Sequence, residues 1–317
     1  MTRPGRGDGM QTVVIANSVG DRVPACARGT VHSVFAHACN IEIASGELVT
    51  LLAPELGAAP HGIRLAIQVA RFDAWLHAGE EAILRDAVLR LPQAGVAVDL
   101  AAAAIWRGTV AGIALETRSS ATEARLRELC AIVLERAPRP GIAAAFRHGA
   151  SHATFLERAF LARLAHTLPV LARATHRRDI DAIAEAAAQL VGLGPGLTPA
   201  GDDFLTGYLA ALWTRAGFGA EQEAGLTALA AVLAPLFSHT NAISRQMLDD
   251  AAHGRFAQAL VDVTLALSGA GNINAAAARA LTSGHSSGAD ALCGLLFGYA
   301  PGLLEMQFDA GCIAAAA

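Results

Sequence analysis

The sequence has few charged residues and few aromatic residues for its length. Of its 317 residues, 16% are Asp, Glu, Lys or Arg and 5% are Phe, Trp or Tyr, and the formal net charge is −4 without any basic run. We therefore do not expect a nucleic-acid-binding protein, which needs a basic surface. Hydrophobic residues make up 53% of the chain, largely through alanine. This excess either reflects an alanine-biased coding sequence or leaves apolar surface for a partner.

Cysteine pairs and long apolar runs are also missing. The five cysteines are odd in number, scattered and without a Cys-x-x-Cys pair. Such spacing indicates reduced thiols rather than a disulfide framework or a zinc site. Charged residues interrupt the apolar runs before they reach the roughly 20 residues that cross a membrane, and residues 1–9 carry no signal-peptide core. We expect a cytoplasmic protein with no membrane segment.

The residue pattern changes near position 118. Residues 12–115 contain short apolar or alternating segments typical of strands, including 12–16, 47–53, 62–69 and 96–100. From about residue 120 onward the apolar residues follow a helical period. The sequence therefore predicts an α+β protein with a β-rich N-terminal domain, residues 1–118, and an α-helical C-terminal domain, residues 119–317.

Three local signals give expected helix limits. Ser120-Ala121-Thr122-Glu123 is a capping box that begins a helix reaching about residue 137. Pro169 is expected to kink or split the next helix, residues 151–174. Asp179 is expected to cap a third helix, with Gly192 at its C-terminal end.

Residues 192–207 form the most informative stretch of the chain. A glycine-rich loop with Gly194 and Gly196 leads to Thr198 and Pro199, which suit the N-cap and the first position of a helix. Asp202 and Asp203 follow about one turn into that helix. The loop follows a helix rather than a strand and contains no Gly-Lys-Ser/Thr, so neither a dinucleotide-binding motif nor a P-loop is indicated.

A fainter copy of this stretch lies near the C-terminus. Gly201-x-Asp203-x-Leu205-x-Gly207 aligns with Gly288-x-Asp290-x-Leu292-x-Gly294. Ser287 and Asp290 have a spacing similar to a capping box. In both copies a glycine lies one turn after the Asp on the same helix face, where it lets another backbone come close. We expect the two helix starts to meet in one pocket.

A helix N-terminus that follows a glycine-rich loop offers free backbone amides to an anion. The aspartates near these N-termini could have one of three roles. They could bind Mg²⁺, a candidate cofactor that the substrate phosphate would share. They could instead accept hydrogen bonds from substrate N–H groups while the amides hold the anionic end. As a third alternative, each Asp only caps its own helix and favours the helix dipole.

The candidate site residues fall into three groups. The catalytic candidates are Asp203, Asp290 and Asp202, and the same three carboxylates are the candidate metal ligands. The substrate-binding candidates lie in the glycine loop, in the segment before the second Asp and in a polar segment between them: Gly194, Gly196, Thr198, Gly201, His285, Ser286, Ser287, Gly288, Asn241 and Ser244.

The stretch from Gly194 to Leu205 resembles the signature of the AllH family. The segment Gly284 to Asp290 is similar to that family's second motif, and His32-Ser33-Val34-Phe35 with Gly46 to Leu51 is similar to its N-terminal part. Ala200 departs from the Ser that many members carry there, which removes one hydroxyl from the loop. The resemblance covers most of the chain.

The resemblance implies a subunit of an oxamate carbamoyltransferase-type enzyme of allantoin and purine nitrogen catabolism. Such an enzyme interconverts oxalurate plus phosphate with oxamate plus carbamoyl phosphate. The implied partners are an FdrA-like and an AllG-like subunit. Two other functions stay open: a non-catalytic assembly subunit of that complex, and a stand-alone metal-dependent enzyme acting on a small amide or phosphate.

Overall fold

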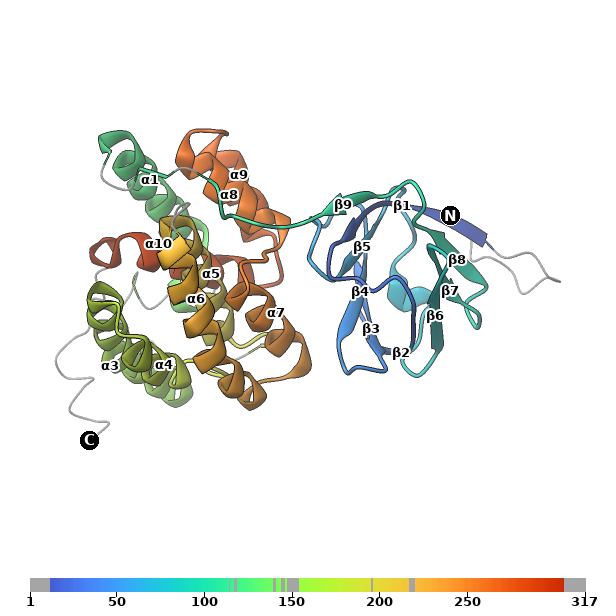
Figure 1. Ribbon diagram of the computed structural model, residues 1–317, viewed down its shortest axis with the longest axis horizontal. Helices are drawn as coiled ribbons and strands as arrows, with labels where there is room; N and C mark the ends of the chain where they lie inside the picture. Colours follow the sequence, from blue (N-terminus) through green and yellow to red (C-terminus); the bar gives the residue numbers. More distant parts are fainter. Residues whose placement is uncertain are drawn as a thin grey trace. The chain divides into compact units, whose positions relative to one another are not determined.

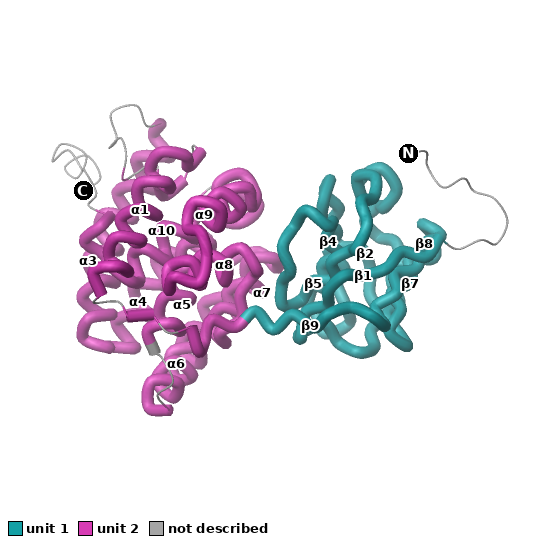
Figure 2. Tube along the Cα trace, turned by 90° about the horizontal axis from the view of Figure 1, so that it is seen from above, with its two compact units in different colours: residues 1–108 teal, residues 109–317 magenta. Residues whose placement is uncertain are grey.

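The structure, a computed structural model, divides into two compact units, residues 1–108 and 109–317 (Figure 2). It describes residues 12–304 except 114, 117–118, 139–140, 144–145, 147–153, 195 and 217–219. The first unit is built of strands and the second of helices, so the predicted α+β class is confirmed. The boundary lies after Gly108, earlier than the predicted position after residue 118.

Unit 1 is a β-barrel-like domain. Its strands are β1 Thr12–Gly20, β2 Ala27–Val34, β3 Ala38–Ile43, β4 Leu48–Leu52, β5 Gly62–Leu65, β6 Glu81–Arg85, β7 Val88–Leu91, β8 Val96–Asp99 and β9 Ala104–Trp106. They follow the order β5-β4-β3-β2-β6-β7-β8-β1-β9, and β1 also pairs with β5 (Figure 1). The sheet therefore closes on itself, with β9 added beside β1.

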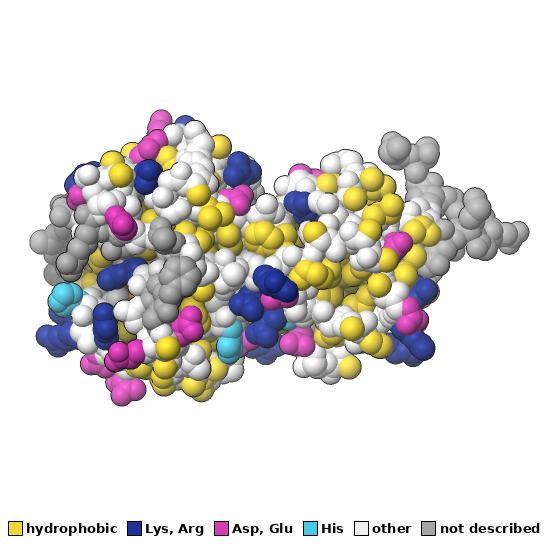
Figure 3. All heavy atoms as spheres, turned by 45° about the horizontal axis from the view of Figure 1, so that its top comes forward, with side chains coloured by type: hydrophobic (Ala, Val, Ile, Leu, Met, Phe, Trp, Pro, Cys, Tyr) yellow, Lys and Arg dark blue, Asp and Glu magenta, His cyan; other side chains and the backbone are white. Residues whose placement is uncertain are grey.

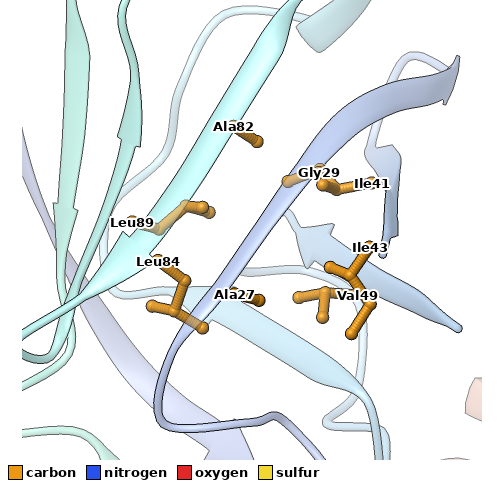
Figure 4. A pocket seen from close by; sticks show the side chains of 8 residues that line it. All are labelled: Ala27, Gly29, Ile41, Ile43, Val49, Ala82, Leu84 and Leu89. Carbon is orange, nitrogen blue, oxygen red and sulfur yellow. The ribbon is translucent and has the colours of Figure 1, made fainter. Parts of the chain in front are cut away.

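The interior of the barrel is mostly apolar, with Ser18 of β1 and Asn40 of β3 among its few buried polar residues. Alternate residues of the strands point inward, as Val14 and Ala16 of β1 do, and pack with Ile41, Leu51 and Ile63. A small pocket between β2, β3, β4, β6 and β7 is lined by Ala27, Gly29, Ile41, Ile43, Val49, Ala82, Leu84 and Leu89 (Figure 4). None of these side chains can hydrogen-bond an anion, so we regard the pocket as a gap in the core rather than a substrate site.

The hairpin of β6 and β7 was not predicted from the sequence. Arg85 pairs with Val88, so Asp86 and Ala87 form a two-residue loop. Both have positive φ, 54° and 55°, as a type I′ turn requires. This turn usually carries Asn-Gly or Asp-Gly, and Ala87 in place of glycine removes the signal.

Unit 2 is a bundle built around α10. Its described helices are α1 Ser120–Arg136, α3 Phe155–Arg177, α4 Ile180–Ala188, α5 Ala200–Ala216, α6 Ala220–Leu233, α7 Ala242–Ala252, α8 Gln258–Ser268, α9 Ile273–Leu281 and α10 Ser287–Tyr299. α10 packs against α5, and α1 and α9 cover its other sides (Figure 1). All of α10 after Ser287 is buried except Ala291. No helix in the described ranges combines the length and the apolar composition that a membrane crossing requires.

Three expected helix limits need correction. Ser119, not Ser120, caps α1, because its side chain accepts the Thr122 N–H. α3 is not split at Pro169 and ends at Arg177 rather than at residue 174, because burial of Leu164, Leu168 and Leu171 outweighs one lost hydrogen bond. α4 ends at Ala188, before Gly192. The expected start of α3 at residue 151 lies outside the described residues, whereas Asp179 does cap α4, as predicted.

α5 and α10 cross at glycines. A Cβ on Gly207 would lie 1.8 Å from the Ala291 carbonyl oxygen, and a Cβ on Gly294 would lie 1.8 Å from the Phe204 carbonyl oxygen. Thr198 contacts Ser287 where the two helices begin, and Gly298 faces Tyr208 and Ala211 further along, so the two helices run parallel. The expected close backbone approach at these two glycines is confirmed, and it brings both N-termini to the same end of the unit.

We predict that Gly207→Ala destabilises the helical unit by about 2 kcal/mol or more, because the methyl group would overlap the α10 backbone. Gly225→Ala in α6 is the matched control, since a Cβ there meets no atom within 4 Å. This control should stabilise the unit by up to about 1 kcal/mol through helix propensity. Urea unfolding followed by circular dichroism measures both changes, and equal effects of the two variants would contradict the crossing.

Candidate functional site

The two Asp-bearing helix starts meet at a pair of hydroxyl groups. Thr198 Oγ1, just before α5, lies 2.7 Å from Ser287 Oγ, the first residue of α10. Thr198 Oγ1 also donates to Asp203 Oδ2 over 3.0 Å. Asp203 is 2% exposed and Asp290 is fully buried. The two starts therefore meet, as expected, with both carboxyl groups closed off from solvent; that they share one pocket stays a prediction.

The hydroxyls of Thr198 and Ser287 can face one another because neither of them caps its own helix. The Pro199 carbonyl accepts the N–H groups of Asp202 and Asp203, so α5 begins one residue after the expected limit and Thr198 is not its N-cap. Ser286, not Ser287, is the N-cap of α10 and makes no side-chain cap bond. The predicted Ser287–Asp290 capping pair was therefore wrong, because the Ser287 hydroxyl turns toward α5 instead.

Asp290 is held by a distant segment of the chain. Its Oδ1 accepts the backbone N–H of Ile142 over 2.6 Å. A Cβ on Gly141 would lie 2.9 Å from the same oxygen, so only glycine fits there without a shift. Asp290 Oδ2 has no hydrogen-bond partner among the residues that the structure describes. This contact was not predicted from the sequence, because it joins residues 148 positions apart.

Both carboxyl groups of the pair have raised pKa values. Burial is the main cause for Asp203, whose pKa is about 8; the Ser287 hydroxyl opposes the rise, and the nearby charge of Asp290 adds to it. Burial also raises the pKa of Asp290 to about 7, against the Ile142 N–H and the facing Ser286 hydroxyl. Two coupled groups in this range hold about one proton between them near neutral pH.

Asp202 has a different environment. Its Oδ1 accepts the Gly192 N–H over 2.8 Å, and its Oδ2 accepts the Thr240 hydroxyl over 2.5 Å. Burial raises its pKa against these bonds. Asp202 thus joins the glycine loop to the segment before α7. Within the described ranges, no three His, Cys, Asp or Glu side chains are arranged to hold a metal ion, and the three candidate carboxylates do not form such a group.

The glycines at the two helix starts serve close packing. A Cβ on Gly201 would lie 2.1 Å from the Leu190 carbonyl oxygen, and one on Gly288 would lie 1.8 Å from the Ala280 carbonyl oxygen. Their N–H groups donate to Leu193 and Ser283, so these two amides are engaged within the protein. Gly194 and Gly196 have φ values of +105° and +116°, which other residues rarely adopt.

The other substrate-binding candidates lie around this arrangement. Asn241 caps α7 and donates to the Leu197 carbonyl, which ties the glycine loop to α7. Ser244 is buried in α7, and its hydroxyl favours the ionised form of Asp202. His285 is exposed in the loop before α10. The structure therefore groups Thr198, Ser286 and Ser287 with the Asp203–Asp290 pair, and Asn241 and Ser244 with the Asp202 side of the loop.

Comparison with models of protein families shows which family the chain resembles. The model described as oxamate carbamoyltransferase subunit AllH matches residues 190–299, and that of the AllH family N-terminal domain matches residues 11–105. The chain belongs to the AllH family. The first match covers the starts of both α5 and α10, and the second covers almost the whole barrel. The family description names a subunit, which implies a multi-subunit complex. No solved structure matches the chain significantly.

We predict that Asp203→Asn changes how stability depends on pH. The folded pKa of about 8 lies above the value of about 4 in an unfolded chain. The folded state then keeps a proton that the unfolded chain has lost, so the free energy of unfolding falls as the pH rises through this window. The Asn variant has no carboxyl group to titrate at this position, so its free energy of unfolding does not fall in this way. Relative to the natural chain, its stability should rise with pH by at least about 1.4 kcal/mol, which corresponds to a shift of one pKa unit.

Urea unfolding at about pH 5 and about pH 8 measures this difference. Asp249→Asn on α7 is the control, because the Asp249 side chain is 49% exposed. A relative stability of Asp203→Asn that stays constant across the window, like that of the control, would contradict the buried proton.

Proposed function

We propose that this chain is the subunit of an oxamate carbamoyltransferase-type complex that binds the small anionic amide substrate where α5 and α10 begin. The observation that carries the proposal is the pair of buried carboxyl groups, Asp203 and Asp290, at two parallel helix N-termini in a member of this family. The partial positive charge of two helix N-termini favours a negatively charged ligand in front of them.

The reaction proposed is oxalurate plus phosphate to oxamate plus carbamoyl phosphate, in allantoin and purine nitrogen catabolism. A phosphate oxygen attacks the carbamoyl carbon, and the bond from that carbon to the oxamate nitrogen breaks. The leaving nitrogen needs a proton, which the Asp203 carboxyl donates. The proton that hydrogen phosphate loses then restores Asp203, so the reaction is balanced without any further reactant.

The pair is suited to this proton transfer by its pKa values. A group that must both donate and regain a proton works best when its pKa lies near the working pH. The pKa of Asp203, about 8, meets this condition. The hydroxyls of Thr198 and Ser287 can carry the proton between the carboxyl and the substrate, because each hydroxyl both donates and accepts.

An assembly role is the second candidate, and the surface of the barrel favours it. Val13 and Ile15 on β1, Ile67 after β5 and Ile105 on β9 are 63%, 54%, 54% and 61% exposed. Figure 3 shows hydrophobic side chains gathered on one face of this unit. Apolar surface of this kind is typical of subunit interfaces. FdrA-like and AllG-like subunits are the partners proposed for either role.

We predict that Asp203→Asn lowers the rate of carbamoyl-phosphate formation at least about 100-fold in the complex with FdrA-like and AllG-like partners, because the proton donor is lost. Size-exclusion chromatography should show that the complex still assembles. Asp249→Asn should leave the rate unchanged. Unchanged turnover by the Asp203→Asn complex would contradict the catalytic role and favour the assembly role.

A further inference from the structure

Asp290 carries a buried oxygen that has no hydrogen-bond partner among the described residues. The side chain is fully buried, and its Oδ2 has no hydrogen-bond partner within the described part of the chain. The Ser286 hydroxyl faces the carboxylate and favours its ionised form, which opposes the rise of the Asp290 pKa. Leaving a buried acceptor unpaired costs about 1–3 kcal/mol, more for a charged group, so such an atom in a native structure calls for a ligand or a functional reason.

The contacts of the two carboxyl groups differ in kind. Asp290 Oδ1 faces the N–H of Ile142, which can only donate, so the contact favours the ionised form. Asp203 faces the hydroxyls of Thr198 and Ser287, which accept as well as donate. The titratable groups described around Asp290 are Asp203 on α5 and Cys293 on its own helix. A single proton is therefore better placed on Asp203, and Asp290 Oδ2 is left as an acceptor.

The backbone at Gly141 and Ile142 fixes the direction of this acceptor. Ile142 is fully buried, and the missing side chain of Gly141 allows the peptide to lie against the carboxylate. A Cβ at position 141 would also come within 3.3 Å of the Ser286 Cβ. With Oδ1 held in this way, the direction of Oδ2 is fixed as well, and none of the described residues donates a hydrogen bond to it.

We infer that Asp290 Oδ2 accepts an N–H of the substrate's primary amide or carbamoyl group, and that the Gly141–Ile142 peptide positions it for this bond. The inference rests on the proposed function and names the residue that recognises the amide. Asp290 is fully buried in this structure, so binding of the ligand must be accompanied by exposure of Oδ2. Oxamate is the ligand whose amide end fits this acceptor.

Oxamate and pyruvate test the inference, because they differ only by NH₂ in place of CH₃. Calorimetry with the full-length chain, in its assembled complex and with phosphate present, should show oxamate bound at least about tenfold more tightly than pyruvate, the value of one hydrogen bond to a charged group. Asp290→Asn and Gly141→Ala should bring this ratio close to one. Gly225→Ala should leave it unchanged.

The ratio separates recognition from general damage. A variant that merely folds poorly weakens the binding of both ligands and keeps their ratio. A natural complex that binds neither ligand, or both equally, would overturn the inference, as would an undiminished preference in Asp290→Asn and Gly141→Ala. A complex that prefers oxamate over pyruvate but transfers no carbamoyl group would contradict only the proposed function. A complex that transfers the group, but whose preference for oxamate is the same in Asp290→Asn and Gly141→Ala as in the natural chain, would contradict only the inference.

Discussion

The site depends on the close crossing of α5 and α10. Helix axes usually lie 8–10 Å apart, at a distance set by the side chains between them. Gly207 and Gly294 remove those side chains, and each faces a backbone carbonyl of the other helix. At a wider spacing the hydroxyls of Thr198 and Ser287 would not reach one another. The glycines are thus the reason that two separate helix starts form one group.

The same crossing explains why the carboxyl groups are buried. Phe204 and Ala291, whose carbonyl oxygens face the two glycines, directly follow Asp203 and Asp290 in the chain. A contact this close holds the two helix starts together, and Asp203 and Asp290 are 2% and 0% exposed. Burial then raises both pKa values by more than the hydroxyl and N–H donors around the pair lower them. A packing requirement in the helical core therefore yields a pair of acids that titrate near neutral pH.

Much of this could be predicted from the sequence, because the signals are local. The change from strand to helix periods gave the fold class, and the repeated Gly-x-Asp-x-Leu-x-Gly pattern gave the pairing of α5 and α10. The hairpin at Asp86–Ala87 was missed because its turn lacks glycine. The contact of Ile142 with Asp290 joins positions 148 residues apart, so no local pattern indicates it. Asp202 and Asp203 are neighbours in sequence, but helix geometry points them in different directions, and only the structure shows which groups each one contacts.

A double-mutant cycle between Asp203 and Asp290 tests the central claim, that the two helix starts form one site. Carbamoyl-phosphate formation would be measured for Asp203→Asn, Asp290→Asn and the double variant in the assembled complex. Residues that act as a unit have strongly non-additive effects. The double variant should therefore lose about as much activity as the more damaging single variant. A loss equal to the product of the two single losses would show that the carboxyl groups act independently and would contradict the claim.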